Sequence, residues 1–161
     1  MSPDAPPSTA SGGPTDPVAP RRWLLVQGGD ARYALDIEGI VAIMSTVALV
    51  PLPRVPEFIR GATVFRECVV PVLDVRQRLV PGSGDDGRGA KVVVCLWQQQ
   101  MIGLRVAGVG PLVQADRQEQ VSERESEDGV ARFFDGYIPI SRGAVPILSL
   151  AALCDFPLGA D

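Results

Sequence analysis

An internal repeat restricts the fold of this chain more than any other feature of its sequence. Moving Trp23–Val26 forward by 69 positions places it on Val92–Cys95, and the same shift carries Ala34–Leu35 onto Gly103–Leu104. The order of the apolar runs is also the same in both halves. A sequence that repeats its pattern in this way predicts two copies of one small structural unit.

The second part of the repeat has a larger offset. Val70–Leu73 reads Val-Pro-Val-Leu and Val145–Leu148 reads Val-Pro-Ile-Leu, 75 positions later, and Gly61 and Gly136 each stand ten residues before the proline. A longer loop in the second half explains the six extra positions. The alternative is chance similarity between two β-rich halves, which share Gly and Val-Pro for ordinary reasons.

The apolar runs are short, rich in Val and Ile and separated by Gly, Pro or Asp, which is typical of strands. Pro71 and Pro146 interrupt two of them, so each is expected at a sheet edge or a bulge, because proline has no N–H for the ladder. The predicted fold is mainly β, with two tandem small five-stranded β-barrel subdomains and a few short helices. The strands are expected at 23–26, 33–37, 63–65, 68–73, 91–97, 101–106, 110–113 and 144–148, and the helices at 37–44, 75–79 and 150–153.

Composition divides the chain into a folded part and tails. The first residues carry six Pro and no Lys or Arg before Arg21, which is typical of a disordered tail rather than a secretory signal. The Gly-rich stretch near residue 85 indicates a break between the halves. We therefore expect a disordered tail at 1–21, a folded domain at 22–155 and a C-terminal tail at 156–161. Within the domain we expect one subdomain at about 22–80 with closure by the C-terminal end, a linker at 81–90 and a second subdomain at about 91–141.

Charge and cysteine content narrow the class of protein. The net charge is −4 and 6% of residues are aromatic, so the basic surface and aromatic platforms of nucleic-acid binding proteins are missing from the composition. No apolar stretch approaches the roughly 20 residues that span a bilayer. Cys68, Cys95 and Cys154 are odd in number and lie in apolar runs, which predicts reduced, mostly buried thiols and a cytoplasmic location.

The sequence offers little for catalysis. It has no histidine, the commonest general base and metal ligand, and its three cysteines lack zinc spacing, so no metal, cofactor or enzymatic activity is expected. The enzymatic alternative is a small β-barrel hydrolase that uses Asp36 and Asp74 as paired carboxylates. Both aspartates follow apolar runs, where Asp usually caps a turn or a helix, as Asp74 would before residues 75–79.

One segment resembles a known signature. Gly61–Arg76 reads GATVFRECVVPVLDVR, which is similar to the CheW signature of an Asn-Leu-Arg-Gly turn followed by a strand that ends Val-Pro-hydrophobic-hydrophobic-Asp-hydrophobic-Arg. Trp23–Met44 resembles the first hairpin and short helix of CheW domains, and Pro56–Gly61 resembles the linker before the signature. The resemblance covers about 22–155.

The resemblance implies a non-catalytic chemosensory adaptor that couples a CheA-type histidine kinase to the cytoplasmic tip of a methyl-accepting chemoreceptor. The composition and the short apolar runs predict no nucleic-acid partner and no membrane insertion, and the resemblance leaves the kinase-binding residues unknown. The expected receptor face contains one cation, one acid and four apolar side chains. They are Arg66, Phe65, Glu67, Ile37, Ile40 and Val41.

Two positions depart from the family pattern. Glu67 replaces the glycine of the turn, and Ala42 stands where the family carries a Glu as a partner for the signature Arg. Glu38 lies one helical turn before Ala42 in the expected helix and is the candidate substitute partner of Arg66. These departures keep open a second hypothesis, in which the chain is a divergent stand-alone CheW-like binding module recruited to another regulatory partner.

Overall fold

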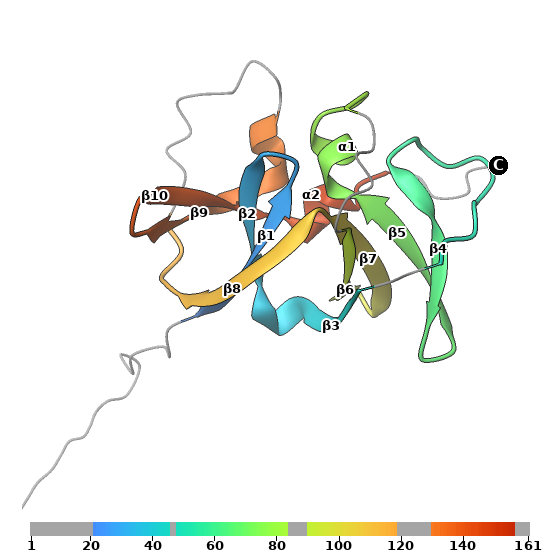
Figure 1. The fold of residues 1–161 in the computed structure, drawn as a ribbon, viewed down its shortest axis with the longest axis horizontal. Helices are drawn as coiled ribbons and strands as arrows, with labels where there is room; N and C mark the ends of the chain where they lie inside the picture. Colours follow the sequence, from blue (N-terminus) through green and yellow to red (C-terminus); the bar gives the residue numbers. More distant parts are fainter. Residues whose placement is uncertain (1–20, 46–47, 84–89, 119–129, 157–161) are drawn as a thin grey trace, which may run out of the picture.

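The computed structural model describes residues 21–45, 48–83, 90–118 and 130–156. Two mixed β-sheets, in which most neighbouring strands are antiparallel, contain most of these residues. Each sheet has five strands, and the sheets lie side by side with two short α-helices nearby (Figure 1). The mainly β fold of two five-stranded units is therefore confirmed. The described ranges contain no helix that is long and apolar enough to cross a membrane.

The elements follow one another in two similar series. The first contains β1 (Arg22–Gly28), β2 (Ala31–Asp36), the 3-10 helix η3 (Ile37–Gly39), β3 (Ile40–Met44), β4 (Ile59–Phe65), β5 (Cys68–Asp74) and α1 (Val75–Leu79). The second contains β6 (Lys91–Trp97), β7 (Gln100–Val106), β8 (Gly108–Gln114), η4 (Val130–Phe133), β9 (Phe134–Ile140), β10 (Gly143–Leu148) and α2 (Leu150–Leu153).

The two repeats exchange strands. The first sheet has the order β8-β1-β2-β10-β9 and the second has the order β3-β6-β7-β5-β4, so each sheet takes two strands from one repeat and three from the other. The two orders become identical when each strand is replaced by its repeat partner. A parallel pair joins the repeats at the same place in both sheets, with Ile147 opposite Ala34 and Val72 opposite Gly103.

This pairing differs from the division predicted at residues 81–90. Strands β3, β4 and β5 pair with β6 and β7, while β1 and β2 pair with β8 and β10, so neither sheet lies within 22–80 or 91–141. The prediction placed the boundary at a Gly-rich stretch, which shows where the chain is irregular but not which strands pair. Backbone hydrogen bonds satisfy a strand equally well whether its partner comes from the same half of the chain or from the other half. Except for Arg21 and Phe156, the predicted tails at 1–21 and 156–161 lie outside the described residues, as does most of the linker. Phe156 packs against the main core, so the folded part extends at least one residue beyond the predicted boundary at 155.

Each sheet is open but curls toward closure. Val50, which follows β3 in the chain, exchanges two backbone hydrogen bonds of 2.8 Å with Ala62 of β4. Gln118, which follows β8, does the same with Tyr137 of β9 at 2.8 and 3.0 Å. One bridge thus connects the two edges of each sheet, in place of the continuous ladder of a closed barrel.

The largest core lies between the sheets. Because side chains alternate along a strand, Leu24 and Val26 of β1 point into this core while Trp23 and Leu25 point to the other face of the first sheet. Two smaller clusters fill these other faces. The cluster on the first sheet contains Trp23, Leu25, Ala34, Ile138, Val145 and Ile147. The cluster on the second sheet, called the inner cluster of that sheet below, contains Val72, Val92 and Val94.

Helices α1 and α2 confirm two predictions to the residue. Each begins after a cap, because the Asp74 carboxylate accepts from the Gln77 N–H at 3.1 Å and the Ser149 hydroxyl accepts from the Ala152 N–H at 3.1 Å. The helix predicted at 37–44 is wrong. One turn of 3-10 helix ends at Gly39 and β3 follows, because β6 provides a ladder for these residues.

The outcomes for one strand, the two prolines and the cysteines are mixed. Strand β9 was not predicted, although a shift of 75 positions from β4 finds it. Pro71 and Pro146 lie in inner strands, so the edge alternative is wrong for both. The bulge alternative is confirmed for Pro146, where the register shifts between Pro146 and Leu148. In the other hairpin the shift lies on the partner strand, between Ile59 and Gly61, close to Pro71. All three thiols are free and Cys95 is buried, but Cys68 is exposed because it pairs with Phe65 on the last rung of a protruding hairpin.

Candidate protein-binding site

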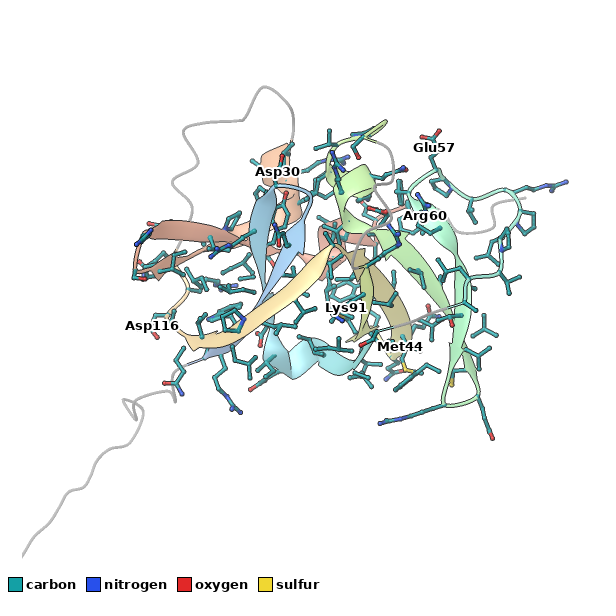
Figure 2. All side chains as sticks on the ribbon, in the orientation of Figure 1. Asp30, Met44, Glu57, Arg60, Lys91 and Asp116 are labelled. Atoms are coloured by element: carbon teal, nitrogen blue, oxygen red, sulfur yellow. The ribbon has the colours of Figure 1, made fainter. Side chains whose placement is uncertain are left out.

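Most of the predicted binding residues lie at one end of the second sheet. Strands β5 and β7 are parallel, so the turns that precede them, at 66–67 and 98–99, lie at the same end. The β4–β5 hairpin protrudes at this end, away from α1 (Figure 1). Strands β3 and β7 both pair antiparallel with β6, so the start of β3 at Ile40 also lies at this end, whereas Met44 lies at the far end of β3 and pairs with Val92. Asp30 marks the β1–β2 turn on the opposite side of the molecule from the hairpin tip (Figure 2).

The tip of the β4–β5 hairpin presents Arg66 and Glu67 to solvent. Their φ angles of 51° and 67° are those of a two-residue type I′ turn, which matches the twist of the flanking strands. The Arg66 guanidinium lies 4.8 Å from the centre of the Phe65 ring. Both central residues of the turn therefore have positive φ without a glycine, and stacking holds a cation at the tip.

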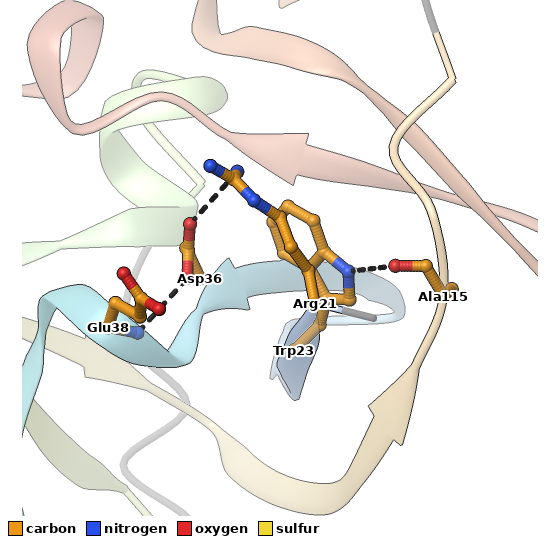
Figure 3. Close-up of polar contacts among 5 residues, drawn as sticks. All are labelled: Arg21, Trp23, Asp36, Glu38 and Ala115. Atoms are coloured by element: carbon orange, nitrogen blue, oxygen red, sulfur yellow. Dashed lines mark hydrogen bonds and ion pairs between the residues drawn. The ribbon is translucent and has the colours of Figure 1, made fainter. Parts of the chain in front are cut away.

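The substitute partner proposed for Arg66 is wrong. Glu38 is exposed on η3, and no ion pair joins it to Arg66 within the described ranges. Its backbone N–H instead donates to Asp36, whose carboxylate also accepts from Arg21 at 3.2 Å (Figure 3). The expected partnership required a helix over 37–44. Because η3 ends at Gly39 after a single 3-10 turn, Glu38 is not carried toward the hairpin tip.

The four predicted apolar residues differ in their surroundings. Val41 and Phe65 both pack on the inner cluster of the second sheet, so the structure brings these two together. Ile40 packs on the main core between the sheets, and Ile37 is half-buried on η3. These four side chains are at most partly accessible, and Arg66 and Glu67 are the fully exposed members of the set.

A cleft of about 260 Å³ opens between the sheets beside η3. Asp36 and Gly39 form its η3 side, Trp97 of β6 and Leu150 of α2 face them, and Arg117 and Asp135 add charge at its rim. The sequence reasoning missed Trp97. The signal was present, because Trp97 is an aromatic residue at the end of the predicted strand 91–97, directly before three glutamines that separate it from the next predicted strand.

The outward face of the β4–β5 hairpin is apolar. Val64 and Val69 are opposite one another and are 63% and 71% exposed. Val50 extends the patch through its bridge to Ala62 and is 65% exposed. Exposed apolar side chains on adjacent strands are typical of protein-binding surfaces.

The two aspartates of the hydrolase hypothesis are not brought together. Asp36 ends β2 in the first sheet, whereas Asp74 ends β5 in the second. Asp74 is buried and accepts from Arg105 at 3.0 Å, in addition to capping α1. Each carboxylate therefore has a structural partner. Among the described residues no group of three His, Cys, Asp or Glu could hold a metal ion.

Comparison with known proteins agrees with this architecture. The family described as CheW-like domain matches residues 22–156. The fold also matches the crystal structure of the scaffolding protein TtCheW from Thermoanaerobacter tengcongensis, with a TM-score of 0.75 and 21% identity over 91% of this chain and 95% of that one. The duplicated β fold, in which the two repeats exchange strands, is therefore a CheW-type fold. The chain belongs to the CheW-like family.

Three named proteins are similar to this chain in sequence. Protein FrzA of Myxococcus xanthus is 36% identical over 50% of this chain and 48% of its own length. Chemotaxis protein CheW of Klebsiella aerogenes is 25% identical over 58% of this chain and 56% of its own. The chain thus spans about half the length of these two relatives. The probable chemotaxis protein CheW of Rhizobium etli is 23% identical over 83% of this chain and 86% of its own length.

Proposed function

We propose that this chain is a non-catalytic chemosensory adaptor that couples a CheA-type histidine kinase to the cytoplasmic tip of a chemoreceptor. Membership of the CheW-like family over residues 22–156 carries the proposal. Relatives named as chemotaxis proteins support it. The role places the chain in the cytoplasm, and it requires binding surfaces rather than reacting groups.

We assign the receptor to the end of the second sheet that carries the β4–β5 tip. Arg66 is exposed there and its guanidinium is stacked on Phe65 at 4.8 Å. Stacking limits the rotamers of the arginine, so less entropy is lost when it binds a carboxylate of the partner. Glu67, Ile37, Ile40, Val41 and Phe65 surround or support this contact in the proposal.

Titration of the purified chain with a chemoreceptor cytoplasmic fragment tests the assignment. Arg66→Ala should weaken the complex by roughly 2 kcal/mol, which is about thirtyfold in Kd, because the partner's carboxylate loses its counter-charge at the interface. The melting temperature should change little, since Arg66 is solvated in the free protein. Glu57→Ala, at an exposed acid outside the assigned face, should leave both quantities unchanged.

The alternative is a CheW-like module that serves another regulatory partner, and Ala42 and Glu67 are the observations that favour it. Co-purification with the kinase and the receptor separates the two. If the wild-type chain binds the kinase and no receptor fragment, the coupling role is refuted and the module hypothesis gains. If it binds both and Arg66→Ala has no effect on the receptor complex, the coupling role survives and the assigned face is wrong.

A further inference from the structure

A second groove adjoins the proposed receptor end. It has a volume of about 150 Å³ and lies between Pro71 of β5, the β6–β7 hairpin and the segment that follows α2. Trp97, Gln98, Gln100 and Met101 of the hairpin form one wall, and Phe156 forms the other. None of its eight lining residues carries a formal charge.

The wall after α2 is held in place from behind. The Arg78 guanidinium donates to the carbonyls of Ala152, Leu153 and Asp155, each at 3.1 Å. The Phe156 ring meets the Phe58 ring edge to face, with centres 4.9 Å apart. Fixed walls make the groove preformed, so a ligand does not have to order it.

The opposite wall is held by an unusual turn. Gln98 and Gln99 have φ angles of 51° and 68°, a left-handed conformation that non-glycine residues adopt at a cost. Two hydrogen-bonded strands hold this turn, since Trp97 pairs with Gln100 and Leu96 with Met101. Gln98 and Gln100 line the groove, whereas Gln99 does not.

The volume of the groove limits its ligand. Cavities of roughly 150 Å³ accommodate a benzene-sized group, and sites for drug-sized molecules are typically about 300–1,000 Å³. The groove therefore suits one large side chain. Small pockets that receive a single aromatic or aliphatic anchor are common at the centres of protein interfaces.

We propose that this groove takes one bulky apolar side chain from an uncharged segment of the receptor tip. The neutral lining favours such a segment, because a partner charge would lose its hydration and find no counter-charge. The exposed Val64 and Val69 lie on the hairpin that contains Pro71, so the apolar surface continues from the groove toward Arg66. The inference rests on the proposed function and adds an anchor site to it.

Charge substitutions on the three consecutive glutamines test the inference. Gln98→Glu, Gln98→Lys, Gln100→Glu and Gln100→Lys place either charge at the groove, and Gln99→Glu and Gln99→Lys place the same charges on the same turn but outside it. All three glutamines are exposed, so the variants should fold, which thermal unfolding confirms. Receptor-fragment affinity is measured for each by titration calorimetry.

Both charges at 98 and 100 should weaken receptor binding at least about tenfold, because either sign is desolvated without a partner. Both charges at 99 should change Kd by less than about twofold, and kinase binding should be unchanged throughout. Opposite effects of Glu and Lys at 98 or 100 would indicate a charged partner and overturn the neutral anchor. Equal affinities for all six variants would also overturn it while leaving the adaptor role intact, and a wild-type chain that binds no receptor fragment would overturn both.

Discussion

Gly61 and Gly136 occupy the same position in the two repeats, and each faces a backbone carbonyl where a side chain would begin. A Cβ atom on Gly61 would lie 2.6 Å from the Val50 oxygen, and one on Gly136 would lie 2.4 Å from the Gln118 oxygen. Both residues have positive φ angles, 140° and 111°. The hydrogen-bonded bridge between the two edges of each sheet therefore requires glycine at this position.

Replacing either glycine should disrupt its bridge. We expect Gly61→Ala and Gly136→Ala each to lower the free energy of unfolding by about 3 kcal/mol or more, since the strained φ and the contact with the carbonyl add together. Gly143→Ala is the control, because Gly143 has a φ of 134° with no atom within 4 Å of its Cβ position. Chemical denaturation measures all three. Equal losses would show that the carbonyl contacts are unimportant.

The turn at Arg66 and Glu67 predicts a stabilising substitution. Glycine is the preferred residue at the second position of a type I′ turn, and Glu67 has a φ of 67° there. Glu67→Gly should raise the free energy of unfolding by about 1 kcal/mol. Glu57→Gly, at an exposed position without a positive φ, should instead lower it slightly. A decrease in both variants would mean that Glu67 makes a favourable contact in the hairpin.

Replacing Arg78 by lysine should destabilise the fold. Its guanidinium donates to three carbonyls at the end of α2 and lies 4.4 Å from the centre of the Phe58 ring and 4.9 Å from that of Phe133. Lysine keeps the charge but loses the planar fork and the stacking, so Arg78→Lys should cost about 2 kcal/mol. Arg76→Lys, on the same helix, should cost less than about 0.5 kcal/mol. Thermal unfolding of both variants is the measurement, and equal values contradict the role of the fork.

The three thiols should react in two classes. Burial raises the pKa of Cys95 to about 12 and that of Cys154 to about 11, whereas Cys68 is exposed. Because the thiolate is the reactive form, one thiol should react with Ellman's reagent in the native protein at about pH 8, and three should react in denaturant. Cys68→Ser should abolish the native reaction. Two rapidly reacting thiols in the native protein would contradict the burial of Cys95 or Cys154.

The same pKa shifts make stability depend on alkaline pH. Unfolded thiols release their protons near pH 8.5, whereas the folded Cys95 and Cys154 keep theirs to a higher pH. Above about pH 8.5 the folded state therefore binds more protons at these thiols, so their contribution to the free energy of unfolding is constant below this pH and falls as pH rises. Denaturation between pH 7 and 10 measures the slope, and a Cys95→Ala/Cys154→Ala variant should be flatter over this range.

The sequence determined the features that depend on neighbouring residues or on the repeat. Alternating apolar residues indicated most strands, and the residues that cap α1 and α2 fixed where both helices begin. The recurrence of Gly61 at Gly136 marked the repeat. These features are local or are periodic along the chain, so no knowledge of the tertiary fold was needed to find them.

The tertiary structure alone decided which strands pair. Residues 40–44 look helical in isolation and become a strand because β6 lies beside them, and the repeats exchange strands through parallel pairs such as Val72 and Gly103. The groove at Gln98 and the exposure of Cys68 follow from that pairing. Backbone ladders are chemically identical for every partner, so the choice of partner is made by which side chains bury one another across the finished core.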